Sequence, residues 1–163
     1  MAFVKWLFVL LFAGSQAFPN GAPLQACRDL IPRHPFPAQR TVSPFALTVT
    51  PITNQGKNTG LKISVNDTAS SPGSIAGFLI QVRDENSGRF IGKLSNVANV
   101  SKYACNARAA VTHMDNRKKV VSSLQFTWDP AGEVDGVVQV RVYATIVKAA
   151  NQYWTPVASQ LSS

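Results

Sequence analysis

The chain of 163 residues carries 16 Lys and Arg against 8 Asp and Glu, a net charge of +8, and has only two cysteines. This length suits one domain with a single core. No stretch approaches the roughly 20 apolar residues of a membrane-spanning helix, so we expect no membrane span. A chain this basic is attracted to polyanions, although the charge can also serve only to keep a domain soluble.

Residues 1–17 have the features of a secretory signal peptide. Lys5 precedes an apolar run from Trp6 to Ala13, and Ser15 and Ala17 supply small residues at the −3 and −1 positions of a cleavage site. An N-terminal anchor is the alternative. Cleavage leaves residues 18–163 as one domain with a net charge of +7, since Lys5 is the only charged side chain removed. We expect a secreted, extracellular protein, for which anionic lipid, bacterial envelope polymers and sulfated glycans are more plausible partners than nucleic acid.

The segment that follows, residues 18–34, is irregular. Proline and glycine recur too often in it for a helix or a central strand. It holds Cys27, and Cys105 lies 78 positions further on. In an exported chain the simplest interpretation is one structural disulfide, which would strap this segment across the domain. Two free thiols or an intermolecular bridge are the alternatives, whereas a redox pair would call for a CxxC spacing.

Residues 36–43 also have loop character, and from Phe45 onwards apolar and polar residues alternate. Such alternation is typical of strands with one buried and one solvated face. The apolar residues of the alternating runs are Phe45, Leu47 and Val49; Leu61, Ile63 and Val65; Phe78, Ile80 and Val82; Leu124, Phe126 and Trp128; and Val138, Val140, Val142, Ala144 and Ile146.

Turn-forming residues separate these runs. Asn86-Ser87-Gly88 predicts a hairpin between strands at 77–83 and 89–94. The mature chain shows no stretch of helical period. About seven or eight short strands with regular turns predict an all-β protein, an antiparallel β-sandwich, with a closed barrel as the alternative.

Two sequons, Asn66-Asp67-Thr68 and Asn99-Val100-Ser101, are candidate N-glycosylation sites. Asn66 lies on the parity opposite Leu61, Ile63 and Val65, so its side chain should face solvent. Parity does not decide the orientation of Asn99.

No residues with the spacing of a catalytic, metal or cofactor site stand out, so we expect no enzyme and no cofactor. The two histidines, His34 and His113, could meet if Cys27 is tied to Cys105, but a metal site wants a third ligand. We expect them to hydrogen-bond loop backbone instead.

Basic residues gather between positions 102 and 119, where five of them accompany one acid, Asp115. Exposed cations of this kind suit phosphate or sulfate groups, although they also occur on ordinary solvated loops. The candidate ligand contacts are Arg108, Arg117, Lys118 and Lys119, with Arg28 and Arg33 as outer candidates if the disulfide brings them near.

Two tryptophans occupy different settings. Trp128 has the buried parity of its strand, so we expect it in the core. Trp154 follows the last predicted strand, where it could pin the C-terminal tail to the domain or be exposed for ligand contact.

Several motifs together resemble the reeler (reelin-type) domain, specifically the small secreted insect defence proteins. The matching elements, in chain order, are Phe18-Pro19-Asn20-Gly21-Ala22-Pro23, Cys27, Pro32-Arg33-His34, Gly77-Phe78-Leu79-Ile80-Gln81-Val82-Arg83, Cys105, Thr112-His113, Phe126-Thr127-Trp128 and Trp154. The resemblance implies an immunoglobulin-like sandwich with Cys27 bonded to Cys105. It also implies a role in innate immunity, described as antimicrobial, through contact with bacterial surface components or blood cells.

The sequence therefore suggests a secreted defence protein whose basic face engages anionic envelope polymers of the lipopolysaccharide or lipoteichoic acid class. The alternative is an extracellular adhesion or matrix module that binds protein or glycan. Oligomeric state is not indicated by the sequence.

Overall fold

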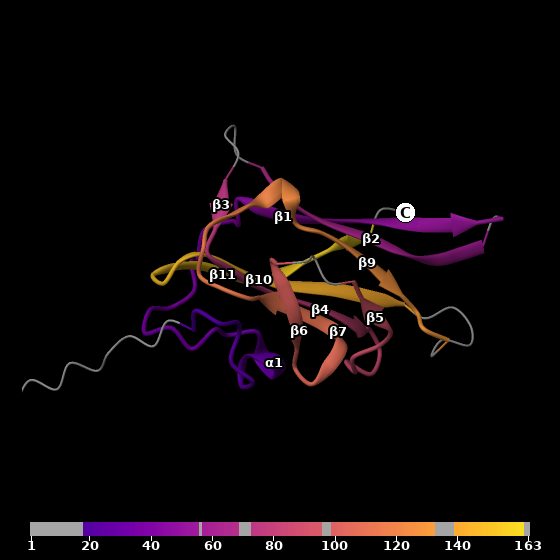
Figure 1. The fold of residues 1–163 in the computed structure, drawn as a ribbon, viewed down its shortest axis with the longest axis horizontal. Helices are drawn as coiled ribbons and strands as arrows, with labels where there is room; N and C mark the ends of the chain where they lie inside the picture. Colours follow the sequence, from indigo (N-terminus) through magenta and orange to yellow (C-terminus); the bar gives the residue numbers. More distant parts are fainter. Residues whose placement is uncertain (1–17, 56, 69–72, 96–98, 133–138, 162–163) are drawn as a thin grey trace, which may run out of the picture.

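The computed structural model describes residues 18–55, 57–68, 73–95, 99–132 and 139–161, which form two facing sheets (Figure 1). The predicted signal peptide, residues 1–17, lies outside the described residues. The first sheet has the strand order β12-β1-β2-β9-β5. These strands are β1 (Phe45–Asn54), β2 (Lys57–Asp67), β5 (Lys93–Leu94), β9 (Gln125–Asp129) and β12 (Gln160–Leu161).

The second sheet has the strand order β11-β10-β4-β7-β6. Its strands are β4 (Gly77–Asp84), β6 (Ser101–Ala104), β7 (Ala107–His113), β10 (Val140–Ala149) and β11 (Gln152–Ala158). A two-stranded ribbon joins β3 (Ser74–Ile75) to β8 (Lys119–Val120), and two short helical turns complete the described chain, α1 (Ala26–Asp29) and the 3₁₀ turn η1 (Val121–Ser123).

Strand pairing is antiparallel except where β12 lies parallel to β1. Eight of the described strands have four or more residues. The predicted antiparallel sandwich is therefore confirmed.

The core lies between the sheets. In β9, Phe126 and Trp128 are buried while their neighbours face solvent, as the period-two pattern predicts. Phe126 packs on Phe78 of β4 with ring centroids 5.8 Å apart. The indole Nε1 of Trp128 donates to the carbonyl oxygen of Ile91 at 2.8 Å, so this buried polar group has its partner.

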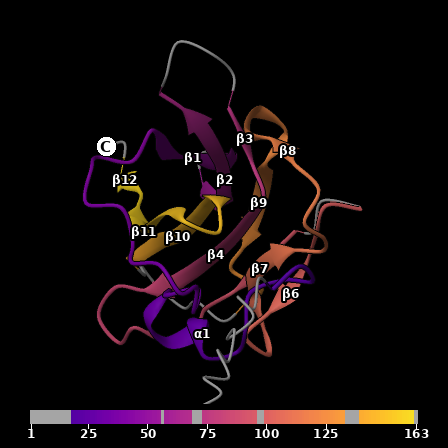
Figure 2. The same cartoon turned by 90° about the vertical axis from the view of Figure 1, so that its left-hand side faces the viewer.

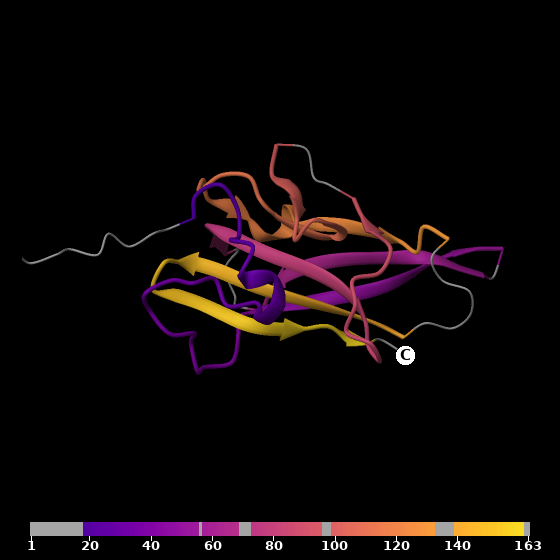
Figure 3. The ribbon, with the colours of Figure 1, turned by 90° about the horizontal axis from the view of Figure 1, so that it is seen from below.

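The second sheet departs from the prediction of one solvated face. Six consecutive residues of β4, from Gly77 to Val82, are buried, including Leu79 and Gln81 on the face away from the core. The N-terminal segment, defined here as residues 18–39, covers that outer face (Figure 2). Seen from below, its helix α1 crosses β4 (Figure 3). The alternating pattern wrongly predicted a solvated face for β4, because the irregular N-terminal segment lies on the sheet as a third layer.

The predicted hairpin after β4 is only half correct. The chain does turn back at Asn86–Gly88, and Arg83 forms a bridge with Phe90. The chain then leaves the second sheet, because Lys93 and Leu94 pair with β9 of the first sheet. This turn therefore links the two sheets.

The predicted C-terminal tail is a strand, β11, which pairs with β10. Trp154 within it is buried and packs edge-on against Phe45, with centroids 5.5 Å apart. Of the two fates considered for Trp154, packing against the domain is confirmed.

The outermost strands of both sheets are short or contain proline. The first sheet ends in β12 and β5, of two residues each, and the second ends in β6, of four residues, and β11, which contains Pro156.

Candidate functional site

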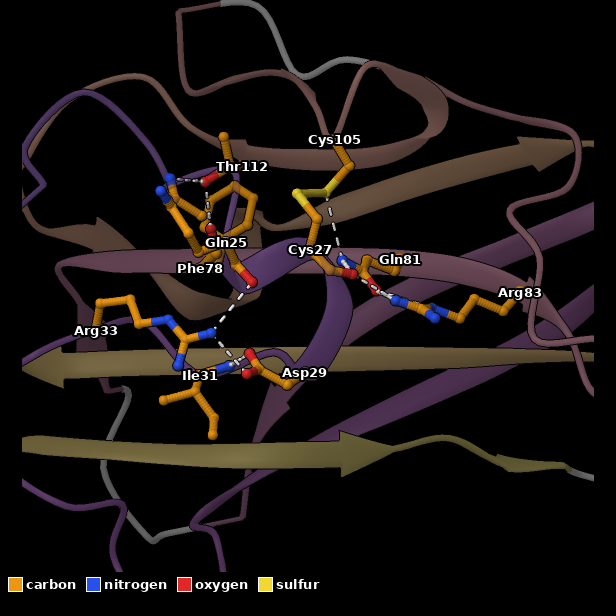
Figure 4. The surroundings of a disulfide bond; sticks show 11 residues. Gln25, Cys27, Asp29, Ile31, Arg33, Phe78, Gln81, Arg83, Cys105 and Thr112 are labelled. Carbon is orange, nitrogen blue, oxygen red and sulfur yellow. Dashed lines mark hydrogen bonds and ion pairs between the residues drawn. A yellow bond between two sulfur atoms is a disulfide. The ribbon is translucent and has the colours of Figure 1, made fainter.

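A disulfide joins the N-terminal segment to the second sheet. Cys27 on α1 bonds to Cys105 in the turn between β6 and β7, with the two Cα atoms 5.4 Å apart (Figure 4). Cys105 and Asn106 both have positive φ, 62° and 52°, which is the backbone of a tight primed hairpin turn. The expected intramolecular bond is thus present in the structure, and neither cysteine is free.

Beside the disulfide, the carbonyl oxygen of Cys27 accepts two hydrogen bonds from β4. Gln81 Nε2 donates at 3.2 Å and Arg83 Nη2 at 2.5 Å. Arg83 also donates to Gln81 Oε1 from Nε and Nη2, at 3.0 and 2.7 Å, as Figure 4 shows. Gln81 is fully buried. These polar side chains serve to satisfy the backbone of the covering segment.

The same arrangement recurs at the end of α1. Leu30 caps the helix with a φ of 65°, and its carbonyl oxygen accepts from the hydroxyls of Thr145 and Thr155 at 2.5 and 3.0 Å. Leu30, Ala26 and Leu79 form a small apolar cluster beneath the segment. The outer face of the second sheet thus combines apolar contacts with hydroxyl and amide donors for an irregular backbone.

His113 at the end of β7 holds the start of the segment. Its Nδ1 accepts from the amide N–H of Phe78 at 3.2 Å, and its Nε2 lies 3.1 Å from the carbonyl oxygen of Phe18. Burial lowers the pKa of His113, which favours the neutral ring that this pattern of one acceptor and one donor nitrogen needs. The expectation that His113 bonds loop backbone is confirmed.

His34 lies within the N-terminal segment, towards its C-terminal end. Its ring packs edge-on against Tyr153 with centroids 5.4 Å apart, and burial lowers its pKa. Within the described residues no group of three or more His, Cys, Asp or Glu side chains could hold a metal ion.

A cavity of about 90 Å³ lies between the N-terminal segment and the second sheet, and both histidines line it. One wall comes from the segment and the other from the strand ends. The apolar lining includes Phe18, Ala22, Leu30, Phe78, Leu79 and Val147, and Asn116 contributes from the loop after β7. No pattern in the sequence indicates this cavity, because its walls come from four separate stretches of the chain.

The structure separates the predicted cationic contacts. Arg108 is exposed at the start of β7, whereas Arg117 and Lys118 are exposed after the opposite end of this seven-residue strand, about 20 Å along it. Arg28, exposed on α1, lies next to the disulfide and so nearer to the Arg108 end. Arg33 is exposed and pairs with Asp29 at 2.7 Å. The single basic neighbourhood expected from the sequence is therefore split.

Lys119 is a correction, because the prediction placed it on an exposed loop. It is only 7% exposed, and its Nζ donates to the carbonyl oxygens of Asp115 and Arg117, at 2.7 and 2.5 Å, and to Asp115 Oδ1 at 3.1 Å. Hydrogen bonds from Arg117 and Lys119 lower the pKa of Asp115 to about 2. Lys119 closes the loop between β7 and β8 from inside and is not available to a ligand.

Both sequon asparagines are exposed. Asn66 faces away from the core as predicted, and its Nδ2 donates to Thr48 Oγ1 on β1 at 2.7 Å. Asn99 lies in a turn with a φ of 60°. Glycosylation at either site stays a prediction. No helix in the described part of the chain is long and apolar enough to cross a membrane.

The chain is similar in sequence to proteins from insects and fish. A "Putative defense protein Hdd11" of Hyphantria cunea is 28% identical over 90% of this chain and 88% of its own length. A "Putative ferric-chelate reductase 1" of Danio rerio is 32% identical over 95% of this chain, which spans only 27% of that protein.

Among solved structures, the human F-spondin reeler domain aligns with a TM-score of 0.54 over 78% of this chain and 94% of that domain, at 19% identity, which supports the fold alone. The family model for the Reeler domain matches residues 25–162, from just before the first disulfide cysteine to the end of the last strand. The chain therefore belongs to the Reeler domain family.

Proposed function

We propose that this protein is a secreted defence protein that engages anionic polymers of the bacterial envelope, of the lipopolysaccharide or lipoteichoic acid class. The observation that carries the proposal is its likeness, along almost the full length of both chains, to the protein of Hyphantria cunea that is named for defence. The net charge of +8 gives the means of attraction to an anionic surface.

The exposed cations supply the contacts. Lys118 and Arg117 extend from the loop between β7 and β8, and the Arg117 side chain is 78% exposed although it pairs with Asp115. Arg28 and Arg108 form a second basic group near the disulfide, with Arg33 on the same N-terminal segment. An extended polymer with repeated phosphates could contact both groups, since each phosphate accepts bidentate hydrogen bonds from arginine.

The test is binding of the secreted protein to Gram-negative and Gram-positive cells, with a neutral glycan as control, at low and at physiological salt. Screening at physiological ionic strength weakens exposed charge pairs beyond about 8 Å, so binding that persists there and differs between surfaces indicates a shaped site. Binding that disappears with salt would reduce the attraction to nonspecific charge and favour the adhesion or matrix alternative.

Charge variants locate the contacts. The double substitution Arg117→Gln with Lys118→Gln should weaken cell binding severalfold, while Lys62→Gln with Lys148→Gln, which removes two exposed charges from β2 and β10, should weaken it less. Equal losses in the two variants would show that only total charge matters.

The proposed export and glycosylation are tested together by mass spectrometry of protein secreted from a eukaryotic host. We expect an N-terminus at Phe18 and glycan mass at Asn66 and Asn99. An N-terminus at Met1 would contradict cleavage, and unmodified asparagines would contradict the sequons.

A further inference from the structure

We propose that the cavity under the N-terminal segment takes the apolar end of a single-chain anionic amphiphile, whose acidic headgroup lies at Lys102 and Lys118. This inference rests on the proposed function, because envelope polymers of the class named above are anchored by acyl chains next to phosphates. It adds to that function a specific pocket and the part of the ligand that enters it.

The cavity has the chemistry of a site for hydrocarbon. Its walls are mostly apolar side chains, with Phe18 and Leu30 from the N-terminal segment facing Phe78 and Val147 of the second sheet. Its volume of about 90 Å³ is several times that of one water, and an apolar cavity of comparable size can hold a small hydrocarbon. It therefore suits a few carbons at the end of a chain and not a whole polymer unit.

Two polar side chains at the cavity wall are already engaged, whereas the buried Nδ1 of His34, which also lines the cavity, has no hydrogen-bond partner among the described residues. His113 uses both ring nitrogens on Phe78 and Phe18, and Thr145 donates to Leu30. A polar ligand group at His113 or Thr145 would have to displace one of these bonds, whereas a hydrocarbon leaves them intact.

The charge around the cavity is positive. Asn116 lines the cavity, and exposed Arg117 and Lys118 follow it directly in the chain. Lys102 lies against the segment, with its Cε 2.9 Å from the position that a Cβ on Gly21 would take, one residue before cavity-lining Ala22. The charges of Lys119 and Lys102 add to the effect of burial in lowering the pKa of His113, so the positive field reaches the cavity wall.

Negative charge in the neighbouring loop is neutralised. Asp115 is the one acid between Met114 and Lys119, and it pairs with Arg117 at 2.5 Å and with Lys119 at 3.1 Å. Lys118 and Lys102 form no ion pair with the described residues, so they are left to attract an external anion. An apolar cavity beside unneutralised cations is complementary to an amphiphile with a phosphate or carboxylate head.

The direct test is calorimetric titration of the secreted, disulfide-bonded protein with dodecyl phosphate below its micelle concentration. Dodecyl maltoside, with the same chain on a neutral head, and inorganic phosphate, with the head alone, are the comparison ligands. We expect one saturable site for dodecyl phosphate and at least tenfold weaker binding of both comparison ligands.

Filling the cavity tests the position of the chain. Ala150→Leu adds a side chain at the cavity wall, and Ala149→Leu is its matched control on the exposed neighbouring position of β10. Excluding two or three methylenes should weaken dodecyl phosphate binding roughly 15- to 50-fold in the first variant and leave it unchanged in the second. Ala76→Leu, at the cavity-lining position between β3 and β4, replaces Ala150→Leu if circular dichroism shows that the latter is misfolded.

The headgroup position is tested by Lys102→Gln with Lys118→Gln, against Lys62→Gln with Lys148→Gln as control. We expect dodecyl phosphate binding to fall severalfold in the first variant only. Binding unaffected by either filling variant would overturn the cavity as the chain site, and equal affinity for dodecyl phosphate and dodecyl maltoside would overturn the anionic preference.

The failure of this inference can be told apart from failure of the proposed function. Cell binding at physiological salt together with no saturable amphiphile site would reject the inference and leave the proposed function standing. Saturable dodecyl phosphate binding without cell binding would reject the envelope as the target and keep the pocket.

Discussion

Replacing Gln81 by Leu should destabilise the protein by about 2–4 kcal/mol. The amide is fully buried, donates to the carbonyl oxygen of Cys27 and accepts two hydrogen bonds from the guanidinium of Arg83. Loss of a hydrogen bond to a charged group costs about 1.5–3 kcal/mol and loss of a neutral one about 1 kcal/mol, and the added apolar contact of leucine recovers part of this. The alternating pattern of β4 alone would place this side chain in solvent, where the same change costs less than about 0.5 kcal/mol.

The measurement is equilibrium unfolding in guanidinium chloride, followed by tryptophan fluorescence under non-reducing conditions. A lower midpoint at an unchanged slope reports a change in stability alone. The matched control is Gln125→Leu on β9, where the glutamine is exposed, and it should stay within about 0.5 kcal/mol of the parent. If both substitutions have the same small effect, the N-terminal segment does not cover β4 in solution.

Three other predictions follow from the same contacts. Replacing both Cys27 and Cys105 by Ser should lower the free energy of unfolding by up to about 4.5 kcal/mol, because the disulfide closes a loop of 78 positions and so reduces the conformational entropy of the unfolded chain. A loss below about 1 kcal/mol in denaturant titrations would contradict this entropic explanation. The pKa of His113 is lowered in the folded state, so its contribution to the free energy of unfolding is complete above the unfolded pKa near 6.5 and is lost as the pH falls below that value, by at most about 1.4 kcal/mol per pH unit. His113→Gln should therefore reduce the difference between the free energies of unfolding at pH 7.5 and pH 5.5. An unchanged difference would show that other groups cause it. Lys119→Gln should destabilise the fold by about 2–3 kcal/mol, because the hydrogen bonds from Nζ to the carbonyl oxygens of Asp115 and Arg117 are lost. Lys118→Gln should leave the thermal stability unchanged. A larger loss of stability for Lys118→Gln than for Lys119→Gln would contradict the buried position of Lys119.

Local pattern was sufficient to predict the sandwich. The strands at Phe45–Asn54 and Gln125–Asp129 each bury alternate residues between two sheets, so a period of two in the sequence corresponds directly to the fold. The disulfide could also be predicted from the sequence, because two cysteines allow only one intramolecular pairing.

What the sequence could not provide was the third layer. Gln81 and Thr145 have the composition of a solvated face, and only the long-range docking of residues 18–39 makes that face an interior. The one local hint was the irregular, proline-rich segment itself, because an ordered segment without regular structure must find partners for its backbone elsewhere.

The prediction that Lys119 is exposed was wrong for a similar reason. A run of three basic residues predicts an exposed loop, but hydrogen bonds from Nζ to backbone carbonyls decide that the third residue points inward. Such carbonyls have no signature in the sequence, since every residue carries one.

The strand edges of this sandwich have a consequence for its behaviour at high concentration. The first sheet terminates on both sides in strands of two residues, and the second terminates in a strand of four residues and in β11, where Pro156 has no amide hydrogen to offer. A second copy would find few consecutive backbone groups on these terminal strands, although β1 continues to Asn54, beyond Val49, the last residue that pairs with β12. The short terminal strands therefore limit edge-to-edge association at those positions, and the part of β1 beyond Val49 is where a second strand would find the longest run of backbone on the first sheet.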